Sequence, residues 1–163
     1  MPASIHTFAV IFILLLSPII TTAETTFPNF TEPPHNYWQQ EPHDLFTKIK
    51  SDLGSGRLKF DTSSEKAFVT GILKALDIPV SSQLLVFSTT SLQLRLINYR
   101  NPRALYFNEE IYLGWVPNGK IEVISIDPNI GGVFHIFNIP RTQEPPTIER
   151  STRCMNCHAG HDV

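Results

Sequence analysis

Turn signals in the second half of the chain constrain its fold more than any other feature of the sequence. Two strand-like runs, Ile111–Val116 and Lys120–Ile126, are joined by Pro117-Asn118-Gly119, a composition typical of a hairpin turn. A further turn-forming stretch, Asp127–Gly132, leads into a third strand-like run, Val133–Ile139. Because short turns join neighbouring antiparallel strands, these runs predict a β-meander.

The region before Pro79 has the periodicity of helices instead. Apolar residues spaced three and four positions apart predict one helix at Asp44–Leu53 and a second at Ser63–Asp77. The stretch from Thr62 to Glu65 fits a capping box at the start of the second helix, and Pro79 ends that helix.

Two shorter runs extend the predicted sheet. Leu84–Phe87 is predicted to be a buried strand, and Ala104–Phe107 a short strand. We therefore predict an α+β fold, in which two N-terminal helices pack on an antiparallel meander of four or five strands. The polar, Pro-rich segment from Pro140 to Arg153 is predicted to be an extended connection to a C-terminal motif.

The N-terminus has the features of a secretory signal peptide. Phe8–Ile20 is an apolar run shorter than the roughly 20 residues that a transmembrane helix needs. Thr21-Thr22-Ala23 offers small residues for cleavage after Ala23. Because no Lys or Arg precedes the run, an uncleaved anchor is the alternative. In both cases the rest of the chain is predicted to be periplasmic or otherwise extracytoplasmic. If the signal peptide is cleaved, no membrane span is expected to remain.

These observations divide the chain into four segments. They are a signal peptide at 1–23, a Pro-rich arm at 24–43, an α+β domain at 44–139 and a connection with the C-terminal motif at 140–163. The chain has 13 Lys and Arg against 15 Asp and Glu, so its charge does not indicate a nucleic acid or an anionic membrane as partner.

The C-terminal motif is Cys154-Met155-Asn156-Cys157-His158, a Cys-x-x-Cys-His run typical of covalent c-type haem attachment. Two thiols at this spacing can add to the two vinyl groups of one haem, and His158 is then placed to bind the iron as proximal ligand. Cys154 and Cys157 are the only cysteines in the chain. An exported location supports this interpretation, because bacteria attach haem c outside the cytoplasm.

Two other interpretations of the motif stay open. His161 extends it to Cys-x-x-Cys-His-x-x-His, which offers four zinc ligands, although zinc sites usually draw ligand pairs from two separated segments. A redox-active Cys-x-x-Cys pair is the other alternative, although such pairs sit at the start of a helix in a βαβ unit, which this sequence does not indicate.

A sixth ligand to the iron is harder to assign from the sequence. Met155 lies inside the motif, so histidines are the candidates, and these are His35, His43, His135 and His161. An iron without a sixth protein ligand is the alternative, and the choice decides whether small molecules can bind.

Two pairs of like charges in the sequence each have a functional and a simpler explanation. Arg100 and Arg103 form a small basic turn that could pair with haem propionates, although solvated charges are the commoner explanation. Glu109-Glu110 could suggest acid–base chemistry, but charges that protect an edge strand explain the pair more simply.

Several stretches between roughly residues 80 and 160 form a distinctive series. They are Leu85-Val86-Phe87-Ser88, Asn101-Pro102-Arg103-Ala104-Leu105-Tyr106-Phe107-Asn108, Tyr112-x-Gly114-Trp115-Val116, Asp127-Pro128-x-x-Gly131 and Arg153-Cys154-Met155-Asn156-Cys157-His158-Ala159. This series resembles a family of exported bacterial proteins with a cytochrome c motif, found mostly in planctomycetes and verrucomicrobia. The resemblance implies covalent haem, but no particular reaction.

In such proteins the chain usually continues well beyond the haem motif, so we expect this chain to be a fragment of a longer protein. Alternatively, the preceding domain or a partner chain supplies the second wall of the haem site. Three functions follow: an electron-transfer protein with haem c, a haem enzyme or sensor with an open iron, or a secreted binding module without haem. The first is favoured, and it implies a redox partner protein that the sequence does not specify.

Overall fold

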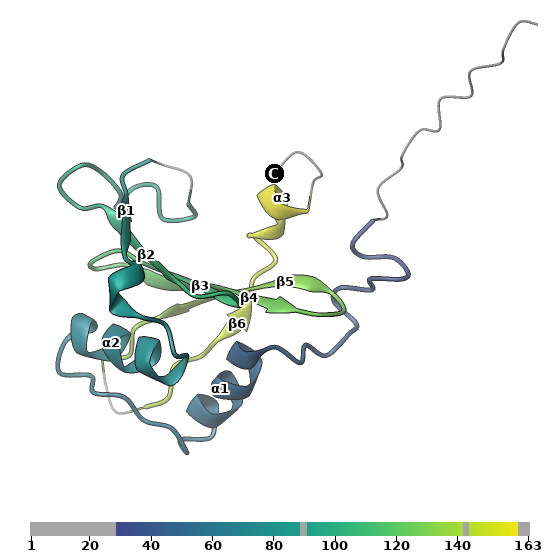
Figure 1. Cartoon of the computed structure of the whole chain (residues 1–163), viewed down its shortest axis with the longest axis horizontal. Coiled ribbons are helices and arrows are strands. Elements are labelled where there is room, and N and C mark those ends of the chain that lie inside the picture. The colour runs from purple at the N-terminus through teal and green to yellow at the C-terminus, as the bar shows by residue number, and fades with distance from the viewer. Residues whose placement is uncertain (1–28, 89–90, 142–143, 160–163) are drawn as a thin grey trace, which may run out of the picture.

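Six strands of one antiparallel sheet run through the computed structural model, which describes residues 29–88, 91–141 and 144–159 (Figure 1). Each strand pairs with its neighbours in sequence, in the order β1-β2-β3-β4-β5-β6. The strands are β1 (Leu84–Val86), β2 (Arg103–Phe107), β3 (Ile111–Trp115), β4 (Lys120–Asp127), β5 (Gly131–Asn138) and β6 (Glu149–Arg150).

Two longer helices precede the sheet, and a short one follows it. They are α1 (Leu45–Gly54), α2 (Glu65–Ala75) and α3 (Met155–His158), and a single 3-10 turn, η1 (Val80–Ser82), leads into β1. The predicted capping box is wrong in detail, because Ser64 caps α2 by accepting a hydrogen bond from the Ala67 N–H at 3.1 Å. The Glu65 carboxylate instead accepts one from the Asn118 N–H at 2.9 Å.

The two faces of the sheet have different neighbours. One face, which we call the helix face, contributes inward side chains to a cluster that also contains side chains of α1 and α2, and both helices lie on that side in Figure 1. Members of this cluster include Phe46, Leu53, Phe68, Ile72, Ile111, Leu113, Ile121, Val123 and Phe137.

Alternate residues of the same strands point the other way, to a face that we call the open face. It consists of Leu105, Phe107, Tyr112, Gly114, Glu122, Ile124, Phe134 and Ile136. The strand register aligns Phe107, Tyr112, Ile124 and Phe134 in one row across four strands. Phe107 and Tyr112 are 39% and 45% exposed, so this row is an apolar surface only partly covered.

The predicted fold, two helices on a meander of four or five strands followed by a separate haem segment, is contradicted. The sheet has six strands, and the sixth belongs to the segment from Pro140 to Arg153 that was predicted to be a mere connection. That segment also leads into a third helix, α3. The error has a physical cause, because β6 pairs with β5 through only two residues, which is too few to leave a periodic pattern.

The prediction of a buried first strand is also wrong. Leu84 and Leu85 are 55% and 53% exposed, because β1 is the edge strand and pairs only with β2. Apolar composition favoured burial, but position at the edge of a sheet depends on long-range pairing.

The predicted signal peptide, residues 1–23, lies outside the described residues. Within the described part of the chain, no helix has the length and apolar character needed to cross a membrane. The described end of the Pro-rich arm packs on the sheet, since Tyr37 is buried and its hydroxyl donates to the Gly132 carbonyl at 3.0 Å.

His135 of β5 is buried on the helix face. Its ring centroid lies 5.0 Å from that of Phe46, and its Nδ1 has no hydrogen-bond partner among the described residues. Burial lowers the pKa of His135 to about 4; nearby Lys50 and Arg150 lower it further, whereas Asp44 opposes them. His135 is therefore neutral at pH 7.

We predict that His135 makes the fold sensitive to acid. The folded state resists protonation of His135 and the unfolded state does not, so its contribution is complete above pH 6.5 and falls as the pH drops toward 4. The loss is about 3 kcal/mol between pH 7.5 and pH 4. In urea unfolding at both pH values, His135→Leu should lose less stability than the wild type, by about this amount. His35→Leu, in the arm, should behave like the wild type, and an equal loss in H135L would contradict the prediction.

Candidate functional site

Two hydrogen bonds of Ser151 place α3 and its Cys-x-x-Cys-His motif over the open face. The Ser151 N–H donates to the Phe134 carbonyl at 2.8 Å, which continues the β5–β6 pairing by one residue. The Ser151 hydroxyl then accepts from the Cys154 N–H at 3.3 Å. Met155, the first of the two variable residues in the motif, is buried in a second cluster with Phe134. In Figure 1, α3 lies across the sheet from α1 and α2.

The side chains of the motif differ in exposure. Cys154 is half-buried and packs against the cluster of Met155 and Phe134, whereas Cys157 and His158 are exposed. Both thiols are free. The His158 ring stacks on Phe134, with ring centroids 4.7 Å apart. The face of the imidazole ring makes the stacking contact. Histidine coordinates a metal through its ring nitrogens, which lie at the edge of the ring, so stacking does not occupy them.

The electrostatics of Cys154 do not resemble those of a redox-active cysteine. Burial raises the pKa of Cys154, and Glu122 raises it further, while the Ser151 hydroxyl and Arg153 act in the opposite direction. Reactive Cys-x-x-Cys pairs depend on a lowered thiol pKa. The direction of the shift therefore disfavours the thiol–disulfide alternative.

The zinc alternative gains no support from the described residues. Within them, no three His, Cys, Asp or Glu side chains come together in a way that could hold a metal ion. His161, the fourth ligand in that hypothesis, lies outside the described residues.

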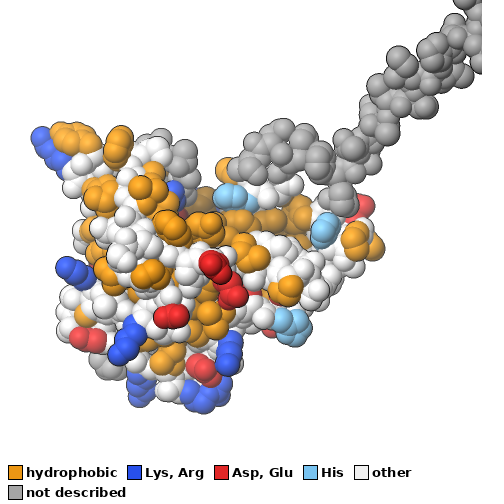
Figure 2. Space-filling view, in the orientation of Figure 1, with side chains coloured by type: hydrophobic (Ala, Val, Ile, Leu, Met, Phe, Trp, Pro, Cys, Tyr) orange, Lys and Arg blue, Asp and Glu red, His pale blue; other side chains and the backbone are white. Residues whose placement is uncertain are grey.

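A cleft of about 1380 Å³ lies beside the motif. Figure 2 shows a hollow on the same side of the molecule as α3, with hydrophobic side chains along its floor. Arg153, which directly precedes Cys154, lines the cleft, and so does Ile136 of the open face. The remaining lining residues are Thr62, Glu65 and the stretches 92–96, 118–120 and 138–141.

The cleft combines apolar walls with basic side chains. Leu92, Leu94, Leu96, Ile136 and Ile139 supply the apolar part of the lining. The basic side chains are Arg95, Lys120, Arg141 and Arg153, and Glu65 is the one carboxylate among the described lining residues. The sequence did not reveal this arrangement, because the four basic residues come from four separate segments and share no motif.

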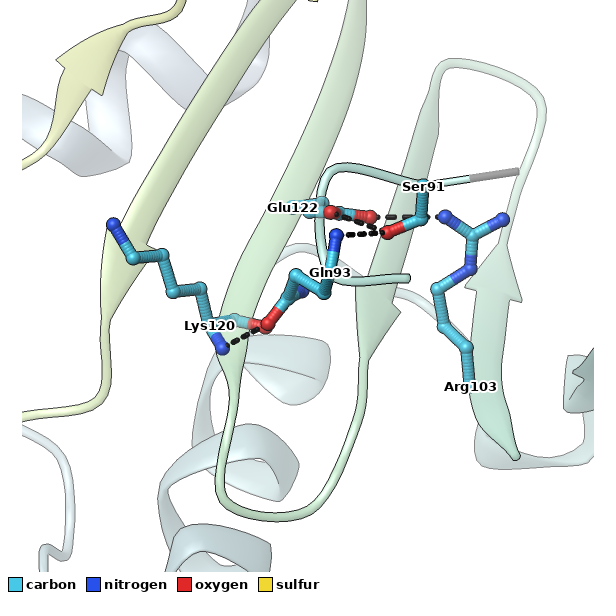
Figure 3. A network of polar contacts seen from close by, with 5 residues as sticks. All are labelled: Ser91, Gln93, Arg103, Lys120 and Glu122. Carbon is cyan, nitrogen blue, oxygen red and sulfur yellow. Dashed lines mark hydrogen bonds and ion pairs between the residues drawn. The ribbon is translucent and has the colours of Figure 1, made fainter. Parts of the chain in front are cut away.

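A polar network fixes the loop 91–96 to β4 (Figure 3). Glu122 accepts hydrogen bonds from Arg103 at 3.0 Å and from the Ser91 hydroxyl at 2.8 Å. The Gln93 amide bonds to both the N–H and the carbonyl of Lys120. These contacts make the loop one wall of the cleft.

Gly119 is required for the close approach of this loop to the β3–β4 turn. A Cβ at this position would collide with the Gln93 side chain and with Val116. The predicted hairpin turn at Pro117-Asn118-Gly119 therefore also contacts Gln93, the side chain that anchors the loop 91–96.

The other predicted site residues are not brought together around the motif. Arg103 is paired with Glu122, so it is not simply solvated as favoured from the sequence, and the Arg100 guanidinium lies over the Tyr99 ring at 5.1 Å. His135 lies on the helix face, across the sheet from α3, which excludes it as a sixth ligand to a haem held by the motif. Glu109-Glu110 lies exposed in the turn before β3, and β3 pairs with β2 and β4 on its two sides, so the interpretation as charges that protect an edge strand is wrong.

Comparison with known proteins identifies no relative. No family model matches the chain, and no curated protein or solved structure is significantly similar to it.

We predict that Glu122 stabilises the wall of the cleft. Glu122→Ala removes two hydrogen bonds and leaves the largely buried Arg103 without its partner, so the free energy of unfolding should fall by about 2 kcal/mol in urea titrations. Glu122→Gln keeps an acceptor for Ser91 and should lose less. Asp52→Ala is the matched control, because it breaks an exposed pair with Arg57 and should cost below about 1 kcal/mol. Equal losses in E122A and D52A would refute this role.

Proposed function

We propose that this protein is an exported carrier of covalent haem c that transfers electrons. The observation that carries the proposal is the Cys-x-x-Cys-His motif on α3, with Cys157 and His158 exposed beside a cleft that has apolar and basic walls. A bound haem c would supply reversible one-electron chemistry at its iron.

The roles of the motif residues follow from their chemistry. The Cys154 and Cys157 thiols would each add across one vinyl group, forming a carbon–sulfur bond while the thiol hydrogen passes to the neighbouring carbon. His158 would bind the iron through a ring nitrogen as proximal ligand. Met155 keeps the helix seated on the sheet, so the positions of the three attachment residues depend on a buried anchor.

Two further considerations support the proposal. The predicted signal peptide leads to the compartment in which haem c is attached, and the chain has no other thiols to compete for pairing. The resemblance to exported bacterial proteins with a cytochrome c motif agrees with covalent haem attachment, which stays a prediction.

Covalent attachment is tested by expressing the chain together with the c-type maturation machinery. The pyridine haemochrome spectrum of the purified protein should show two thioether bonds. Cys154→Ala and Cys157→Ala should each leave a single thioether, and the double variant none. His158→Ala should keep the bonds but alter the axial ligation. Asn156→Ala, an exposed change inside the same motif, should resemble the wild type, and wild-type protein with two unmodified thiols would refute the proposal.

Carbon monoxide separates electron transfer from ligand-binding chemistry. For an electron-transfer protein with six-coordinate iron, the Soret band of the reduced form should not respond to carbon monoxide. A clear response would overturn the electron-transfer assignment in favour of an enzyme or sensor with an open iron.

A further inference from the structure

We propose that the haem held by Cys154 and Cys157 lies in the cleft, against the open face of the sheet, with its propionates among Arg95, Lys120 and Arg141. This inference rests on the proposed function and deepens it. It identifies the wall of the haem site that the motif itself does not supply.

The position of the motif supports this placement. Arg153 lines the cleft and directly precedes Cys154 in the chain, while Cys154, Cys157 and His158 themselves are not among the lining residues. Ile136 lines the cleft from the open face, two positions along β5 from Phe134, on which His158 stacks. The attachment residues and the cleft therefore share one face of the sheet.

The composition of the cleft suits a haem. A macrocycle needs a broad apolar wall, and Leu92, Leu94, Leu96, Ile136 and Ile139 are all among the lining residues. Ligand sites usually enclose about 300–1,000 Å³, so a volume of about 1380 Å³ does not limit a large cofactor. Leu94 is 52% exposed, and covering it would remove apolar surface from water.

Charge complementarity indicates where the propionates lie. Arginine pairs well with carboxylates, and the basic side chains at the cleft outnumber its single carboxylate, Glu65, among the described lining residues. Glu65 itself accepts a hydrogen bond from the Asn118 N–H. The cleft thus offers a positive environment to two negatively charged groups.

The wall opposite α3 is held in place before any ligand binds. The Gln93 side chain is buried and bonds to Lys120, while Ser91 bonds to Glu122. A preorganised wall lowers the entropic cost of binding. This explains why a surface loop that exposes Leu94 also contains the buried polar side chain of Gln93.

The decisive test measures the midpoint potential of the covalently loaded protein. Arg95→Glu and Arg141→Glu each replace a positive by a negative charge at the cleft, far in sequence from the motif. If the haem lies in the cleft, both should lower the potential, because positive charge favours the reduced iron. Lys48→Glu, the same charge change on exposed α1, should leave it unchanged. Potentials of R95E and R141E equal to that of K48E would overturn the placement while leaving covalent attachment intact.

A second measurement does not depend on the thioether bonds. The Cys154→Ala/Cys157→Ala variant, titrated with haemin, should show a shifted Soret band on binding in the cleft. Adding Leu94→Glu, a change at an exposed position that the fold tolerates, should weaken haemin binding about tenfold. Haemin binding that is indifferent to both L94E and R95E would refute the cleft as the haem site.

The two proposals fail in distinguishable ways. Haemin binding by the double-cysteine variant, together with no covalent haem in the wild type, would refute c-type attachment and retain the cleft. Covalent haem with no slowing of amide hydrogen exchange in residues 92–96 on loading would retain attachment and refute the cleft.

Discussion

The pairing of β6 with β5 determines where the C-terminal motif lies. Only His135 and Ile136 of β5 face Arg150 and Glu149 in this pairing, so other contacts must hold the strand. Arg150 provides them. Its guanidinium lies over the Tyr37 ring at 3.9 Å and donates to the carbonyls of Tyr37 and Gln40. A cation over an aromatic ring is worth more when it is removed from water, and here Arg150 is half-buried with its Nε atom fully buried.

The Arg150 contacts join three parts of the chain that are distant in sequence. The arm packs around Tyr37, which reaches β5 through the Gly132 carbonyl. From β6 the chain continues through Ser151, bonded to Phe134, and then into α3. Phe30, Tyr37 and Trp38 of the arm are therefore part of the structure that carries the motif.

β5 contributes side chains to both faces of the sheet. Its residues alternate between the helix face, where His135 and Phe137 contact Phe46, and the open face, where Phe134 meets His158. A strand can serve both purposes because successive side chains point to opposite faces. The same alternation explains why His135, a plausible iron ligand in the sequence, lies on the wrong side of the sheet.

From the sequence by itself came the two longer helices, most strands of the meander and the Cys-x-x-Cys-His motif. Period-four and period-two patterns, Pro79 and the turn at Asn118-Gly119 are local signals, and Cys154, Cys157 and His158 are recognisable without any structure. Only the tertiary structure decided the six-strand sheet, the exposed edge at β1 and the cleft. These depend on pairs such as Ile136 with Glu149, Arg103 with Glu122 and Gln93 with Lys120. Such contacts join residues far apart in the chain and follow no fixed spacing, so no periodicity records them.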